Sequence, residues 1–108
     1  MWNEIVNEKD LKSFMDTMHG FHDSCLKELK YISGAYVNEK LSMFPVNKQR
    51  ILSMIIQRQF EKPSVIEMQF VGLKYLRLSP NDENYTCEIF DATMLLKEDC
   101  VYWCDCGG

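Results

Sequence analysis

The stretch PSVIEMQFVGLKYLRL, residues 63–78, places apolar residues at every second position over a longer run than any other part of the chain. Successive side chains of an extended strand point to opposite faces, so this alternation is typical of a strand with one buried face. The side chains expected on one face are Ile66, Met68 and Phe70. Gly72 interrupts the alternation, and a bulge there would bend the strand and keep Leu76 and Leu78 towards the core. The pattern predicts the central strand of an antiparallel sheet.

The rest of the chain is interpreted outward from this strand. The predicted elements are a helix over about residues 7–19, ended by Gly20, and strands over 25–32, 50–60, 85–96 and 100–106. Residues 35–49 are expected to form a long hairpin connection, with or without short strand extensions, and residues 79–84 a turn-rich loop. At 108 residues the chain is long enough for one core and too short for two domains. We therefore predict a single α+β domain over residues 1–108, with an N-terminal helix packed on a mostly antiparallel meander of about five strands.

Composition narrows the class of protein. Hydrophobic residues make up 46% and charged residues 26%, which is ordinary for a globular protein, and the apolar runs are far shorter than the roughly 18 to 20 residues of a membrane span. A formal charge of −4, with no cluster of Lys and Arg, argues against nucleic acid and anionic membranes as partners and leaves a basic protein as a partner. The N-terminal residues show no export signal and the cysteine count of five is odd, so we expect reduced thiols in a cytoplasm.

Five cysteines raise the question of a metal site. Cys100, Cys104 and Cys106 could join His19, His22, Asp23 and Cys25 around zinc. Structural zinc sites normally use paired ligands on a turn, whereas the three C-terminal cysteines fall in a predicted strand, so we expect neither a metal nor a cofactor. Cys25 is expected to be a core residue, not a nucleophile.

Four polar residues lie within or beside predicted strands, where an uncompensated charge is costly. They are His22, Asp23, Arg58 and Asp91. Two interpretations remain: an ion-pair cluster that fixes strand register, which we prefer, or a small acid–base or ligand site.

Several short segments carry a resemblance to known proteins. They are Phe21-His22-Asp23 after a short helix, Pro-Ser-Val-Ile-Glu at 63–67, Asp91-Ala92-Thr93, and Tyr102-Trp103-Cys104. With them the chain resembles small uncharacterised bacterial proteins of helix-plus-sheet design, some of which are thought to be immunity proteins against a neighbouring toxin. The resemblance implies a binding role and carries over no catalytic residue.

The leading hypothesis is therefore a non-enzymatic protein-binding domain, of which an immunity-type inhibitor of a basic partner is one form. Asp82 and Glu83 in the turn-rich loop, and Glu39 in the long connection, are the predicted contacts, because loops carry binding residues more often than packed strands do. The alternatives are a small enzyme or ligand-binding domain built on the four polar residues above, and a homo-oligomeric structural subunit joined through an exposed strand edge.

Overall fold

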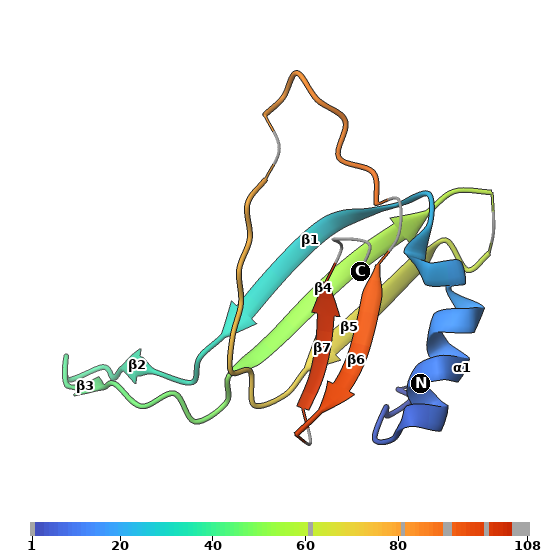
Figure 1. The fold of residues 1–108 in the computed structure, drawn as a ribbon. Coiled ribbons are helices and arrows are strands. Elements are labelled where there is room, and N and C mark those ends of the chain that lie inside the picture. The colour runs from blue at the N-terminus through green and yellow to red at the C-terminus, as the bar shows by residue number, and fades with distance from the viewer. Residues whose placement is uncertain (1, 61, 81, 90–91, 99, 105–108) are drawn as a thin grey trace.

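One α-helix, a short 3-10 helix and seven strands form the fold in the computed structural model, which describes residues 2–60, 62–80, 82–89, 92–98 and 100–104. In chain order the elements are α1 (Glu8–Thr17), η1 (His19–Phe21), β1 (Ser24–Ile32), β2 (Tyr36–Val37), β3 (Met43–Phe44), β4 (Ile51–Arg58), β5 (Val65–Phe70), β6 (Thr93–Lys97) and β7 (Cys100–Cys104). The predicted α+β class is confirmed. The predicted five-stranded meander is wrong, because the described strands lie in three antiparallel sheets (Figure 1).

Strand β4 is the centre of the largest sheet, whose order is β1, β4, β5. Its residues alternate between buried and half-buried along the whole strand, as expected for a strand with apolar side chains on both faces. The prediction of an interior strand over 50–60 is thus confirmed. The prediction that residues 63–78 form the central strand is wrong, since only Val65–Phe70 are a strand and this strand lies at an edge.

The chain leaves the sheet after Phe70 because β4 offers no further pairing there. Phe70 lies opposite Leu52, next to the first residue of β4. Gly72 then adopts φ +70°, a left-handed conformation that glycine reaches without steric cost, and the Leu73 N–H donates to the Arg50 carbonyl at 2.9 Å. The alternating leucines beyond this turn pair with none of the described strands, and Leu76 and Leu78 are exposed.

Strands β6 and β7 form a hairpin that covers the sheet instead of extending it. Met94 of β6 is buried in the same core as Leu52, Met54 and Ile56 of β4, and Figure 1 shows the hairpin in front of the three-stranded sheet. The prediction of a strand over 85–96 is therefore only partly right, because β6 begins at Thr93. Upstream of it, Ile89 makes a single antiparallel bridge with Ser24.

Helix α1 and the turn after it cover the rest of the buried face of the three-stranded sheet. The Asn7 side chain caps the helix by accepting from the Asp10 N–H at 2.8 Å, so the predicted start is confirmed. Leu11 and the residues that follow the helix, Met18 and Phe21, join the core on the face of β4 that the hairpin also covers. Phe21 is fully buried, and its ring meets those of Phe14 and Trp103 edge to face at 5.7 and 5.6 Å between centroids.

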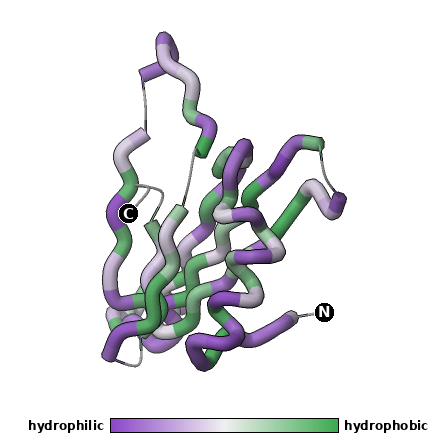
Figure 2. Tube along the Cα trace, turned by 45° about the vertical axis from the view of Figure 1, so that its right-hand side comes forward, coloured by the Kyte–Doolittle hydropathy of each residue, from purple (hydrophilic) through white to green (hydrophobic). Residues whose placement is uncertain are grey.

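The opposite face of the three-stranded sheet carries no covering element among the described residues. The β4 side chains on it are Ile51, Ser53, Ile55 and Gln57, all half-exposed. Figure 2 shows apolar segments concentrated in the strands and mainly hydrophilic ones along the helix and the projecting loop. Within the described part of the chain, no helix has the length and apolar character needed to cross a bilayer.

Candidate protein-binding surfaces

The structure brings three of the four predicted polar residues to one corner of the three-stranded sheet. His22 and Asp23 immediately precede β1, and Arg58 ends β4 opposite Ser24, the first residue of β1. The His22 Nε2 and Asp23 Oδ2 atoms are 3.5 Å apart, an ion pair when the imidazole is protonated, with 56% and 45% of their side chains exposed. Asp91 lies outside the described residues.

Arg58 is turned away from solvent and bonds to backbone groups. The residue is 8% exposed, with Nε donating to the Pro63 carbonyl at 2.9 Å and Nη1 donating to the Thr17 carbonyl at 3.2 Å. The Thr17 carbonyl belongs to the last turn of α1, where backbone oxygens have no partner within the helix. These two bonds join the end of the helix to the turn between β4 and β5. They are bonds to backbone carbonyls, so the register-fixing ion-pair cluster expected from the sequence stays a prediction.

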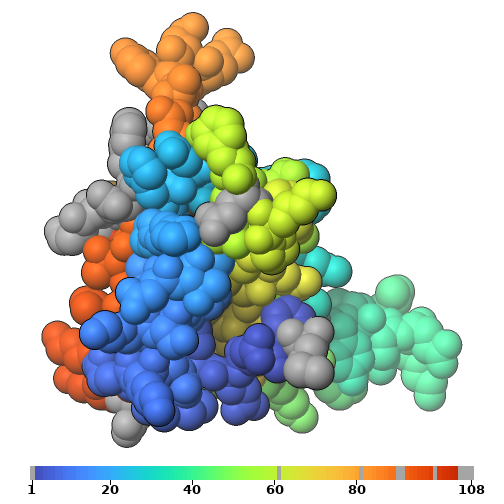
Figure 3. All heavy atoms as spheres, turned by 90° about the vertical axis from the view of Figure 1, so that its right-hand side faces the viewer, coloured from blue at the N-terminus to red at the C-terminus, as the bar shows by residue number. Residues whose placement is uncertain are grey.

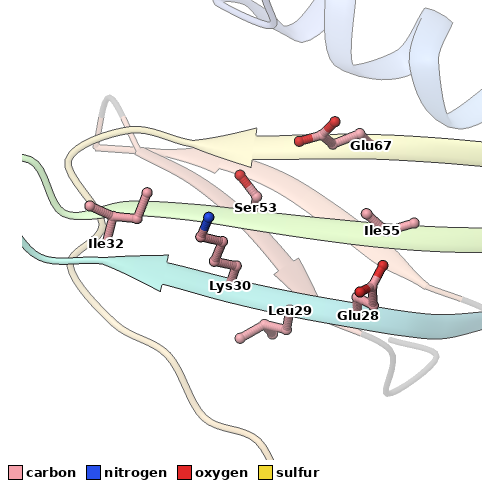
Figure 4. A pocket seen from close by; sticks show the side chains of 7 residues that line it. All are labelled: Glu28, Leu29, Lys30, Ile32, Ser53, Ile55 and Glu67. Atoms are coloured by element: carbon pink, nitrogen blue, oxygen red, sulfur yellow. The ribbon is translucent and has the colours of Figure 1, made fainter.

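A shallow depression lies elsewhere, on the uncovered face of the sheet. It has a volume of about 260 Å³ and is lined by Glu28, Leu29, Lys30, Ile32, Ser53, Ile55 and Glu67 (Figure 4). Strand register places Glu28, Ile55 and Glu67 side by side across the three strands, so two carboxylates flank one isoleucine. We call this set the sheet-face depression. It contains none of the polar residues chosen from the sequence.

The candidate metal ligands include Cys25, Cys100 and Cys104. Among the described residues, no group of three His, Cys, Asp or Glu side chains could hold a metal ion. Cys25, Cys87 and Cys100 are free thiols, whereas Cys104 is disulfide-bonded, contrary to the expectation that all the thiols are reduced. Cys106 lies outside the described residues.

Asp82 and Glu83 lie at the tip of a long connection between β5 and β6, which we call the acidic loop, residues 71–89. Asp82 shapes the tip: its Oδ1 accepts from the Asn84 N–H and side-chain amide, both at 2.9 Å, and its carbonyl accepts from the Tyr85 N–H at 3.0 Å. Glu83 is exposed beside it. The large exposed apolar or aromatic side chains of the loop are Val71, Tyr75, Leu76, Leu78 and Tyr85. Figure 3 shows its tip standing above the body of the protein.

A second projection, the arm, consists of residues 33–50 with strands β2 and β3. The Asn38 Oδ1 atom accepts from the Lys40 and Ser42 N–H groups at 2.9 and 3.1 Å, which fixes the turn. Behind the turn, the rings of Tyr36 and Phe44 stack at 4.9 Å. Figures 1 and 3 show the arm extending away from the body. The sequence predicted a long hairpin connection over residues 35–49, with or without short strand extensions. The structure has the extensions, Tyr36-Val37 and Met43-Phe44, on either side of Asn38.

The arm carries apolar side chains that the body does not cover. Those most exposed are Tyr36, Val37, Leu41, Met43, Phe44 and Val46. Leu41, at the turn, is 86% exposed and has φ +64°, an unusual conformation for a leucine. A group of exposed apolar side chains on one projection, unlike a single one, is typical of a contact surface.

Comparison with known protein families, curated proteins and solved structures finds no match for this chain.

Proposed function

We propose that this protein is a non-enzymatic protein-binding domain that contacts a basic partner through the acidic loop. The observation that carries the proposal is the loop itself, which has no helix or strand over the described residues 71–80 and 82–88. Connections this long are uncommon in small domains, and those that occur are usually functional.

The chemistry of the loop suits a protein partner. Tyr75 and Tyr85 are both largely exposed, and tyrosine supplies large contact area and a hydrogen-bonding group at small entropic cost. Asp82, Glu83 and Glu88 add negative charge to the second half of the loop, and charge of one sign speeds encounter with a partner of the opposite sign. An immunity-type inhibitor of a basic toxin is the form of this function that the sequence resemblance favours.

The enzyme hypothesis gains less support from the structure. Two guanidinium nitrogens of Arg58 donate to backbone carbonyls, and Arg58, His22 and Asp23 do not line the sheet-face depression. A catalytic acid–base pair needs a concave site that holds the substrate against it.

The test is co-expression with the proteins encoded beside its gene, followed by co-purification and, for a toxic neighbour, measurement of protection. The double variant Asp82→Asn with Glu83→Gln should lose capture, while Glu4→Gln with Asp16→Asn, two exposed acids elsewhere, should retain it. Both variants change the net charge equally, so loss in only the first places the contact on the loop. Capture that survives the loop variant overturns the proposed surface, and failure to bind any neighbour overturns the immunity-type role.

A further inference from the structure

The protein exposes far more surface than a folded monomer of its size. Its accessible surface is 8732 Å², whereas a monomer of 12.7 kDa is expected to expose about 6,200 Å². Its radius of gyration is 16.0 Å, against about 13 Å for a compact chain of this length. The excess of about 2,500 Å² is roughly three times the area that each partner buries in a standard interface.

From this excess of accessible surface and from the exposed arm, we propose that the protein forms a two-fold dimer. In this dimer the arm of each copy lies in the sheet-face depression of the other. The proposal concerns surfaces other than the acidic loop, so it holds or fails independently of the proposed function.

The arm is built to be covered on both sides. Tyr36 lies opposite Phe44 and Val37 opposite Met43, and neighbouring pairs of a hairpin face opposite ways, so both faces of the arm are apolar. A hairpin of two-residue strands gains little stability alone, so burial against the sheet of a second copy would supply what the arm lacks.

The opposite charges of the arm and the depression indicate that the arm is covered by a second copy of the chain. The arm carries Lys40, Lys48 and Arg50 against the single acid Glu39, a net charge of +2 in a chain of −4, which leaves −6 on the rest. The depression presents Glu28 and Glu67 around Ile55, with Lys30 as its one basic side chain (Figure 4). A basic apolar arm and an acidic site with an aliphatic floor on the same chain are what a reciprocal pairing needs, because each copy supplies both halves.

The arm is held away from its own body at Gly34. This residue has φ +96°, and a Cβ there would lie 2.9 Å from the Gln49 backbone nitrogen. The Gln49 and Arg50 N–H groups both donate to the Ser33 carbonyl, at 3.0 and 3.2 Å. The base of the arm is therefore tightly packed, and its tip is presented outward.

The first test is the mass of the purified full chain by sedimentation equilibrium. Wild type should show twice 12.7 kDa, and Leu41→Asp at the arm tip should raise the dissociation constant at least about tenfold, as loss of a central apolar anchor does. Phe60→Asp is the matched control: Phe60 is 93% exposed, also has positive φ, and the change in charge is the same. It should shift the constant less than about twofold. A wild-type monomer up to about 100 µM, or a dimer unaffected by Leu41→Asp, overturns the proposal.

The second test distinguishes arm-on-sheet contact from arm-on-arm contact. Glu28→Lys with Glu67→Lys alters only the depression and should also give monomers, with an unchanged far-ultraviolet circular dichroism spectrum. Mixing this variant with Leu41→Asp leaves one intact arm and one intact depression, so a mixed dimer should form at concentrations where neither variant pairs alone. Because an arm-on-arm dimer would be damaged by one altered arm, absence of the mixed dimer overturns the assignment to the sheet face.

Discussion

At the scale of single residues, Phe21 is the largest fully buried side chain of the described core. It connects the segment after the helix to β7 through its edge-to-face contacts with Phe14 and Trp103, and it is completely buried. It does so at φ +63°, a conformation that phenylalanine rarely adopts, so the surrounding packing must hold it there.

Phe21→Ala should lower the free energy of unfolding by about 3–5 kcal/mol, because it leaves a cavity where three elements meet. Urea denaturation followed by circular dichroism measures this change. Phe60→Ala serves as the control, since the Phe60 ring is exposed and lies outside the core. Its removal should change the free energy of unfolding by less than about 0.5 kcal/mol. Equal stability of the two variants would contradict the assignment of Phe21 to the core.

Gly34 and Gly72 allow a matched comparison of steric cost. Both have positive φ, so replacement by alanine strains the backbone at either position by about 1–2 kcal/mol. A Cβ at Gly34 also meets backbone nitrogens at 2.9 and 3.2 Å, whereas at Gly72 the nearest atom is 4.0 Å away, at the end of the Arg50 side chain. Thermal unfolding should therefore show Gly34→Ala to be the less stable variant by at least about 1 kcal/mol. The reverse order would show that the base of the arm relaxes freely.

At the scale of elements, Arg58 joins α1 to the β4–β5 turn through the Thr17 and Pro63 carbonyls. Arg58→Met keeps an apolar stem of similar length but leaves both carbonyls without their donor, so we expect a loss of about 1–3 kcal/mol. Amide hydrogen exchange should show the loss of protection first in the last turn of α1. Arg58→Lys has a single nitrogen and should restore only part of it; full restoration by lysine would contradict the need for two donors.

The sequence predicted correctly those elements whose apolar side chains have a neighbouring element to pack against or pair with. Asn7 and the apolar spacing located α1, and alternation with apolar residues on both faces located β4 as an interior strand. Alternation failed for 71–78 and 85–88, because a two-residue period shows that a strand could form but not that a neighbouring strand is available to pair with it. The site was harder to predict: the sheet-face depression combines Glu28, Ile55 and Glu67 from three strands, and only the register brings them together.

At the scale of the whole molecule, the shape follows from two long segments that leave a small body. The principal extents are 50 × 38 × 26 Å, and both the arm and the acidic loop project from the core. Small-angle X-ray scattering of the monomeric Leu41→Asp variant should give a radius of gyration close to 16.0 Å, well above the value of about 13 Å for a compact chain. A value near 13 Å would mean that the arm or the loop folds back onto the body in solution.

The order of the elements along the chain affects how the protein is made. The face of β4 that becomes the core is synthesised well before β6 and β7, the hairpin that shields it. At ordinary translation rates the ribosome needs roughly 2 to 9 seconds to produce the residues from 59 to 103. During this interval Leu52, Met54 and Ile56 are exposed to water unless α1 or a chaperone covers them. A nascent chain stalled before residue 92 should therefore bind chaperone holdases more strongly than the finished protein does.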